Sequence, residues 1–375
     1  MAYQNVGTPR FYVNDITYSR ALGIFEDYTD YSQGYVDRGT MADGNPNNPF
    51  TDSMPPTVNR NLRFKHINYV LPYNNTNNRY YAILGHNFKS ANKVFRHHWL
   101  DETYPTTDDD NGTTLNSEVL VNGTIGTVQL STGNSHSPFL TPEYDGFSIV
   151  TFHGGTQDAY YEKSNFQIYS PYGLSTTETV HVGDIFLGNY YDMSHSPDLS
   201  LKLSYDYDGI KTQQTKGGAT LSNALYTKPA DWGDYGCWQL GDNPNYRSGR
   251  RSWDLSFSYL SSDSVFPVNA STSYAATVGS ETGYGDNAPS TNTHGTEITS
   301  DDTYEFSSNI LTGTDFFSQV WNKTMGGHLP FIFQPDNTNA NPDQFAICRF
   351  DMDSLQYDQV AHNTYNVKLK IRESW

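Results

Sequence analysis

The chain has 375 residues and a formal net charge of −18, because 41 aspartates and glutamates outnumber 23 lysines and arginines. This excess of acid disfavours binding to a phosphate backbone, which needs clustered basic residues, so we expect no direct recognition of nucleic acid. Aromatic residues make up 15% of the chain, and most of them are tyrosines. That composition favours strands, in which a tyrosine buries its ring and leaves its hydroxyl in water.

Two cysteines, Cys237 and Cys348, are too few for a disulfide framework. They fit free thiols in a reducing cytosol, and neither a metal site nor a cofactor is expected. The first residues lack the basic start and apolar core of a signal peptide, and no run approaches the ~18 apolar residues of a membrane span. We therefore expect neither export by a signal peptide nor insertion into a membrane.

Residues 1–64 combine one short strand signal, Arg10-Phe-Tyr-Val13, with a turn-forming stretch at 43–49. The segment is too short and too polar to form a core alone, so it is predicted to be an N-terminal arm that packs on the C-terminal domain. Residues 65–188 contain strand-like runs separated by clusters of Gly, Asn, Pro and Ser, which predict a β-sandwich. The runs are 67–70, 80–84, 147–152, 166–169 and 182–187.

Residues 189–375 are predicted to form a second β-domain. In the runs 199–205, 253–259 and 365–371 apolar residues occupy every second position, so each strand would bury one face of an antiparallel sheet. Further strands are expected at 329–333 and 345–350, and a long Ser/Thr/Gly-rich loop at 261–302. One short helix is expected over Thr314–Lys323, capped by Thr314 and ended by Gly326-Gly327. The predicted fold class is all-β: an antiparallel, jelly-roll-like β-sandwich and a C-terminal β-domain with one short helix.

Part of the sandwich region is similar to a known kind of domain. Tyr81-Ala-Ile-Leu-Gly-His-Asn87, followed by Ser90-Ala91 and Val94-Phe-Arg96, resembles the early strand and turn of galactose-binding-like jelly rolls. The runs 166–169 and 182–188 match later strands of such domains, so the resemblance covers residues 65 to 190. It implies a β-sandwich whose loops hold a sugar.

Five stretches of the C-terminal region resemble the C-terminal half of minor tail proteins of tailed bacteriophages, particularly marine ones. They are 249–259, 321–324, 327–336, 341–350 and 365–373. Those proteins are similar to distal-tail and tail-tip subunits, which form rings that join the tail tube to the host-recognition apparatus. The resemblance implies contacts with copies of itself in a ring, expected to be hexameric, and with other tail proteins. The long loop and the N-terminal half depart from a minimal distal-tail subunit, which leaves the exact position in the tail open.

Sugar binding commonly uses an exposed aromatic platform with amides and carboxylates beside it. In the predicted sandwich His86, Asn87, Trp99 and Tyr161 are the candidates for contacts with a glycan. The alternative is that Trp99 belongs to the core and His86 caps a turn.

Basic residues near two strands are candidates for a subunit interface in this acidic chain. The polar face of the last strand carries Lys368, Lys370 and Arg372. Pairing of these charges with an acidic neighbouring subunit would fix the orientation of the two subunits. Arg250 and Arg251 begin an earlier strand, where they would bind carboxylates of a neighbouring subunit or simply close a turn. Arg251 shares a strand face with Trp253, so stacking is also open; for the last strand the alternative is a solvated face.

Catalytic motifs are weak. Ser90-Ala-Asn-Lys93 has the Ser-x-x-Lys spacing of some acyl-transfer enzymes, but the companion motifs are missing. The adjacent His97-His98 would point to opposite faces of a strand, which disfavours a shared metal. The chain is therefore not expected to be an enzyme.

Together these features predict a virion structural protein of a tailed bacteriophage, a distal-tail or tail-tip ring subunit that is made in the cytoplasm of the bacterial host. One alternative is a carbohydrate-binding adhesin that recognises host surface glycans. Another is a tail-tube or head-tail connector subunit.

Overall fold

The computed structural model describes residues 6–23, 26–28, 43–45, 48–58, 60–65, 78–100, 116–130, 135–153, 163–199, 201–207, 211–223, 249–267, 310 and 313–374. Within these ranges every strand pairing is antiparallel. The predicted all-β class is confirmed. Predictions that fall on Cys237, on the strand at 67–70 and on most of the loop at 261–302 lie outside the described residues.

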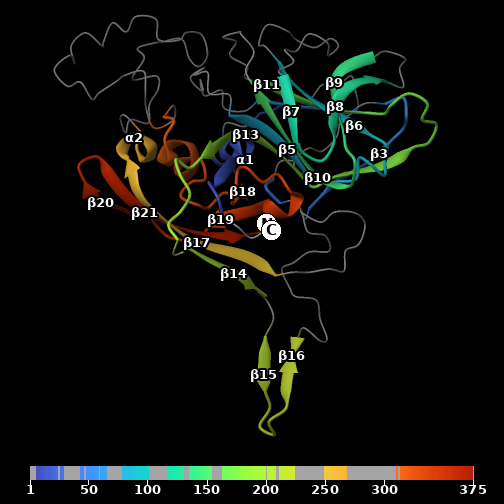
Figure 1. Cartoon of the computed structure of the whole chain (residues 1–375). Coiled ribbons are helices and arrows are strands. Elements are labelled where there is room, and N and C mark those ends of the chain that lie inside the picture. The colour runs from blue at the N-terminus through green and yellow to red at the C-terminus, as the bar shows by residue number, and fades with distance from the viewer. Residues whose placement is uncertain are drawn as a thin grey trace, which may run out of the picture.

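A sheet of eleven described strands forms the body of the molecule, in the order β14-β17-β21-β19-β18-β1-β13-β5-β10-β7, with β20 paired to β21 (Figure 1). Its strands are β1 (Arg10–Val13), β5 (Arg79–His86), β7 (Asn116–Val121), β10 (Gly146–His153), β13 (Asp184–Asp192), β14 (Lys202–Asp206), β17 (Arg250–Ser261), β18 (Phe331–Gln334), β19 (Ala346–Phe350), β20 (Tyr357–Ala361) and β21 (Thr364–Glu373).

A second sheet covers the β13-β5-β10 part of the first and completes a sandwich. Its described strands are β2 (Glu26–Tyr28), β4 (Arg60–Lys65), β11 (Lys163–Tyr169), β6 (Val94–Leu100), β9 (Ser135–Thr141) and β8 (Thr124–Gln129), in that order. Two strand pairs stand beside the sheets: β3 (Phe50–Met54) with β12 (Glu178–Val182), and β15 (Thr212–Gln214) with β16 (Thr220–Ser222). The described helices are α1 (Asp15–Ala21), α2 (Ser262–Val265), the π-helix η4 (Phe317–Asn322) and the 3-10 helix η5 (Pro342–Gln344).

Strand β1 lies in the middle of the large sheet. It pairs with β13 on one side and with β18 on the other, and so joins strands of the sandwich region to strands of the C-terminal region. Its consecutive side chains point to opposite faces. Phe11 packs against Phe333, whereas Tyr12 packs against Tyr80. This strand therefore contributes to a core on each side of the sheet.

Three large apolar cores and one small cluster result. The sandwich core lies between the two sheets and includes Tyr81, Ile83, Phe95, Phe166 and Ile185. The C-terminal core lies beneath η4 and includes Phe11, Trp253, Phe316, Phe350 and Leu369. A third core occupies the opposite face of the large sheet and includes Tyr12, Tyr80, Phe147, Ile332 and Phe345. Middle strands such as β1 and β18 are thus buried on both faces, whereas β17 and β21 bury the single face that was predicted for them.

The large sheet bends around this third core. β10 is five places from β19 in the strand order, which in a flat sheet corresponds to about 24 Å. Yet the ring of Phe147 in β10 lies 6.1 Å from the ring of Phe345, the residue that precedes β19. Open sheets of this width commonly curl, because each strand adds to the twist. We therefore call the third core the concave core.

The predicted domain boundaries do not divide the sheet. The boundary between residues 188 and 189 falls inside β13, which pairs with both β1 and β5. Residues 1–64 do contact the C-terminal region through β1, as predicted, but β3 and β4 of the same segment pair with β12 and β11 of the sandwich region. The segment therefore supplies strands to both parts and is not a separate arm.

Alternation predicted the C-terminal strands well, with two exceptions. Trp253, Leu255 and Phe257 of β17 and the odd-numbered residues 367–371 of β21 are buried as expected. The strand predicted at 199–205 begins only at Lys202, and Leu199 is fully exposed. Tyr259 was predicted to share the buried face of β17 but is exposed. A bulge after Phe257 places it at φ +62°, and Leu260 takes the buried position.

The predicted helix at 314–323 is present as the short π-helix η4, and the side chain that bonds to its first turn is that of Asp315, not that of Thr314. The Asp315 carboxylate accepts a hydrogen bond from the backbone N–H of Ser318 at 2.9 Å. Gly326 and Gly327 both have positive φ and end the turn, as predicted. Helix α1 was missed, although Asn14 caps it by accepting a hydrogen bond from the backbone N–H of Ile16.

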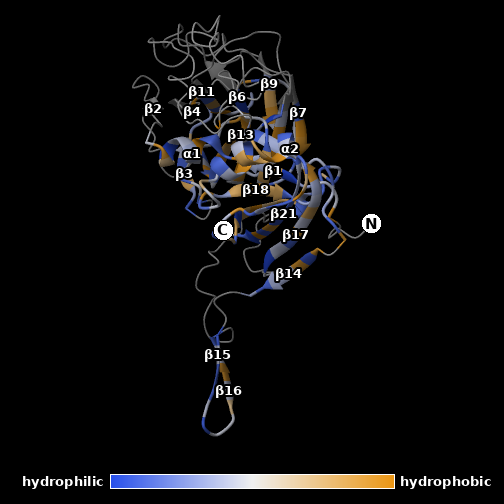
Figure 2. Cartoon of the chain, turned by 90° about the vertical axis from the view of Figure 1, so that its left-hand side faces the viewer, coloured by the Kyte–Doolittle hydropathy of each residue, from blue (hydrophilic) through white to orange (hydrophobic). Residues whose placement is uncertain are grey.

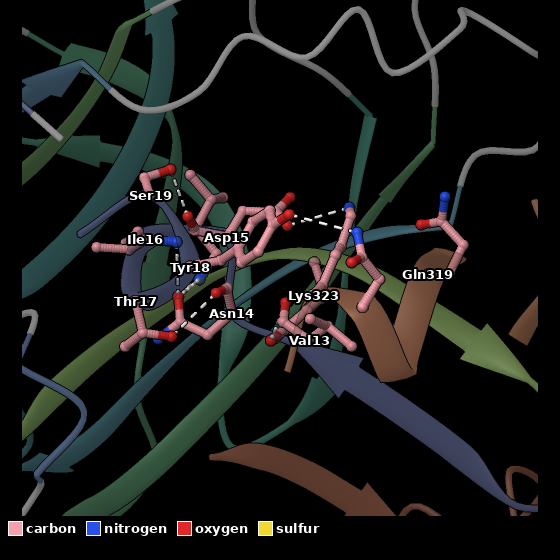
Figure 3. A network of polar contacts seen from close by, with 12 residues as sticks. Val13, Asn14, Asp15, Ile16, Thr17, Tyr18, Ser19, Gln319 and Lys323 are labelled. Atoms are coloured by element: carbon pink, nitrogen blue, oxygen red, sulfur yellow. Dashed lines mark hydrogen bonds and ion pairs between the residues drawn. The ribbon is translucent and has the colours of Figure 1, made fainter. Parts of the chain in front are cut away.

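A polar network joins α1 to η4 (Figure 3). The Nζ of Lys323 lies 3.1 Å from the Oδ1 of Asp15, and the lysine side chain is almost completely buried. Asn322 donates a hydrogen bond to the hydroxyl of Tyr18 at 3.3 Å. Charges removed from water are tolerated when they are paired. The network therefore fixes the first helix against a segment three hundred residues later in the chain.

We expect Phe11→Ala to lower the free energy of unfolding by about 3–5 kcal/mol, because it empties a site lined by four other phenylalanine rings. Urea unfolding followed by both tryptophan fluorescence and circular dichroism measures this loss. Tyr172→Ala, which truncates an exposed ring, is the control and should change stability by less than about 0.5 kcal/mol. A loss below about 1 kcal/mol for Phe11→Ala would show that β1 is not essential to the C-terminal core.

Candidate functional site

Of the four candidate glycan contacts, only the side chains of His86 and Asn87 are described, and neither lies on an exposed platform. His86 is only 2% exposed; it lies at the end of β5, where its Nε2 is 2.8 Å from the Oγ of Ser148 and its ring stacks on Phe88. Burial lowers the pKa of His86 to about 4, and the nearby Asp145 counteracts this only in part. His86 is therefore a buried, neutral histidine. This agrees better with the alternative prediction, in which His86 caps a turn, than with a glycan contact.

Both the nitrogen and the oxygen of the Asn87 side-chain amide form hydrogen bonds with the backbone of the same chain. Its Nδ2 donates to the carbonyl oxygen of Thr179 at 2.8 Å, and its Oδ1 accepts from the backbone N–H of His181 at 2.7 Å. The side chain thus ties the turn after β5 to β12. The side chain of Trp99, in β6, and the whole of Tyr161 lie outside the described residues. Within the described part of the chain, the predicted glycan site is not assembled.

We expect the stability of the protein to fall as the pH is lowered through the interval from 6.5 to about 4. The unfolded chain binds a proton at His86 in this range and the folded chain does not, so protonation favours unfolding. The destabilisation by His86 is absent above pH 6.5 and reaches roughly 3 kcal/mol of lost stability by pH 4. Urea unfolding from pH 7 to pH 4 measures it.

His86→Gln should reduce the slope of stability against pH, whereas His362→Gln, at an exposed turn, should leave the slope as in the wild type. Equal slopes for the two variants would contradict the assignment of His86 as a buried neutral base.

Arg251 was predicted to contact a neighbouring subunit. In the structure its partners are instead residues of the same chain. It lies on the inner face of β17, 3.1 Å from Glu373 of β21, and donates to the carbonyl oxygens of Asp343 and Phe345. Its guanidinium also lies 5.4 Å from the ring of Trp253, so the predicted stacking is present. Burial alone would lower the pKa of Arg251, but Glu373 raises it above the usual value. Arg251 joins β17, β21 and the entry to β19.

Glu373→Gln should lower the free energy of unfolding by about 2–4 kcal/mol, because it leaves the charge of Arg251 half-buried without a carboxylate. The matched control is Asp351→Asn, which breaks the exposed pair of Lys370 with Asp351 and should cost less than about 1 kcal/mol. Urea unfolding at low and high salt compares the two. Equal losses would contradict a special role for the Arg251–Glu373 pair.

The basic stripe of the last strand is present on the solvent side of β21, as alternation predicted. Lys370 lies 2.6 Å from Asp351, which raises the pKa of Lys370, and Arg372 lies 3.6 Å from Asp206. Lys368 is exposed, and no ion pair with another described residue is found for it. Exposed pairs of this kind contribute little and exchange partners readily. The stripe is therefore partly neutralised by its own chain.

Arg250 lies on the same solvent side of the sheet as the stripe. In the ladder between β14 and β17 it is opposite Asp206. Together with the exposed ring of Tyr259, which alternation had assigned to the interior, these side chains mark the outer face of the C-terminal sheet. Tyrosine and arginine are the residues most often found as anchors of protein interfaces.

The Ser-x-x-Lys spacing does not create a Ser–Lys pair. Ser90 donates to the carbonyl oxygen of Asn87, whereas the Nζ of Lys93 donates to the Oγ of Ser170 at 2.7 Å. Lys93 and Ser170 are 2% and 1% exposed, and burial lowers the pKa of Lys93. This hydrogen bond satisfies an ammonium group in the interior, where no substrate reaches it.

A feature that sequence reasoning missed is the hairpin of β15 and β16. It projects from the body below β14, away from both large sheets (Figures 1 and 2). All side chains from Lys211 to Leu221 are exposed. The turn signal Lys216-Gly-Gly218 was visible, but a turn does not reveal whether its strands pack on the body. We refer to residues 211–223 as the hairpin arm.

No group of three or more His, Cys, Asp or Glu side chains among the described residues is arranged to hold a metal ion. In the same residues we find no helix with the length and apolar character that crossing a bilayer requires. Comparison of the chain with protein families, with curated proteins and with solved structures finds no match.

Proposed function

We propose that the chain is a virion structural protein of a tailed bacteriophage, made in the host cytoplasm and assembled into a ring at the distal tail or tail tip. In this role its copies contact one another and other tail proteins, and link the tail tube to the host-recognition apparatus. The ring assembles through surfaces of the C-terminal sheet.

One observation carries the proposal. The five stretches that resemble minor tail proteins are separated in the sequence but supply β17, the end of η4, β18, β19 and β21. Their apolar residues meet in the C-terminal core, where Trp253, Trp321, Phe333, Phe350 and Ile371 lie together. The resemblance therefore concerns one structural unit.

The outer surface of this unit supports an assembly role. Within the described residues β14 and β7 end the large sheet, and end strands carry backbone groups that a neighbour can pair with. Tyr259 and Arg250 of β17 and Lys368 of β21 lie on the outer face of this part of the sheet. A repeated contact between two different patches closes into a ring when the rotation between copies allows it.

The adhesin alternative loses two of its candidate residues, because His86 and Asn87 are occupied inside the sandwich. The tail-tube and connector alternatives differ from the proposed ring in how copies stack, which is a property of the assembly.

The native mass of the purified full-length chain tests the proposal. We expect mass photometry to show one closed oligomer, a hexamer, and negative-stain images to show rings. A monomer at micromolar concentration would contradict the ring. A monomer or trimer that binds a glycan array would support the adhesin, and continuous tubes would support a tail-tube subunit.

Two exposed tyrosines provide a matched pair of variants for the same measurement. Tyr259 is 79% exposed on the C-terminal sheet and Tyr172 is 64% exposed on the sandwich. Tyr259→Ala should weaken self-association about tenfold, as expected for an aromatic interface anchor, whereas Tyr172→Ala should leave it unchanged. Equal behaviour would exclude the outer face around Tyr259 as the interface.

A further inference from the structure

The hairpin arm cannot derive its stability from its own packing. Its side chains are almost all polar, and Leu221, its one large apolar residue, is half exposed. An isolated two-stranded hairpin is at best marginally stable in water. The arm is nevertheless regular: Thr215 N–H donates to Ala219 at 2.8 Å and Asn223 N–H donates to Lys211 at 3.2 Å. Such an element gains stability when a third strand joins it.

The hydrogen-bond pattern shows which backbone groups are available. Residues 215 and 219 form a hydrogen-bonded pair, and so do residues 211 and 223. Residues 213 and 221 lie opposite each other between these two pairs, so they form a third hydrogen-bonded pair. The N–H and C=O groups of Thr212 and Gln214 therefore point away from β16, and those of Thr220 point away from β15. Among the described strands, none pairs with either long edge of the arm.

The charge of the arm indicates its partner. Residues 211–223 contain two lysines, Lys211 and Lys216, and no acidic residue, while the chain as a whole has a net charge of −18. The arm is thus a basic projection from an acidic body. Opposite charge steers such a projection towards the body of another copy. A polyanion such as nucleic acid would be repelled by the rest of the chain.

We infer that the hairpin arm binds a second copy of this chain, where one of its open edges adds a strand to an end of that copy's large sheet. Backbone hydrogen bonds provide the contact, and the two lysines orient it on the acidic body. This inference rests on the proposed function, because it names the element through which ring subunits hold one another. The partner is recognised by its exposed strand edge and negative charge.

Sedimentation velocity of the full-length chain at low salt tests the role of charge. Lys216→Glu should weaken self-association about fivefold, because it places an acid against an acidic partner. Lys89→Glu is the matched control, since Lys89 is also an exposed lysine at a turn. The dissociation constant for self-association of the Lys89→Glu variant should stay within twofold of the wild-type value. Raising the salt concentration should weaken self-association of the wild type.

Proline substitutions test the backbone contact. Gln214→Pro removes an outward N–H from β15 and Thr220→Pro removes one from β16, without removing a donor used inside the hairpin. One of the two should weaken association at least about tenfold while the other has less effect, since only one edge is paired. Urea unfolding of both variants should match the wild type, because the arm lies outside all three cores.

A photo-reactive phenylalanine at Leu221 identifies the occupant directly in the purified protein, and irradiation should give a product of twice the chain mass. If rings form but no cross-link appears, and Lys216→Glu behaves as Lys89→Glu, the inference is wrong while the ring proposal stands. If the wild type does not self-associate at all, both fail. A cross-link within one chain only would also overturn the inference.

Discussion

The two hydrogen-bond ladders of β1 hold the molecule together. β1 pairs with β13 and β18, and Phe11 and Tyr12 anchor it in cores on opposite faces of the sheet. The close approach at its end depends on Gly188, because a Cβ there would overlap the carbonyl oxygen of Val13. α1 then follows at once, seated by Asn14 on β13 and by Asp15 on Lys323. A chain that did not place β1 correctly would leave the sandwich and the C-terminal sheet as separate halves.

Local patterns predicted several strands, among them β5, β10, β17, β19 and β21, but missed others, such as β3, β4, β8 and the two strands of the hairpin arm, and gave no order in the sheet. Alternation identified β17 and β21 because their neighbours leave one face in water. It failed at Tyr259, where the bulge changes which residues face inwards, and at 182–187, where Gly183 separates β12 from β13. The central place of β1 depends on pairings with strands 180 and 320 residues away, as the Arg10–Asp192 and Tyr12–Gln334 contacts illustrate. Neither composition nor spacing carries that information.

The candidate site illustrates the same limit for side chains. Alternation predicted that Arg251 and Trp253 share a strand face. The role of Arg251, however, is decided by its ion pair with Glu373, and the pairing of β17 with β21 brings these two residues together. His86 and Asn87 had the chemistry of a glycan site, and the fold uses that chemistry for hydrogen bonds to the buried hydroxyl of Ser148 and to the backbone of β12. Polar side chains at strand ends serve both purposes, so only burial separates the two roles.

The arrangement of the cores restricts where other molecules can bind. The middle strands of the large sheet are covered on both faces, so their side chains are committed to the interior. Backbone groups suitable for pairing are then found at the ends of the sheet and along the hairpin arm, with Tyr259 as an aromatic contact on the outer face. Backbone pairing requires no particular side chains and leaves no motif in the sequence. The assembly that we propose would use such strand edges, and side-chain chemistry alone does not reveal contacts of that kind.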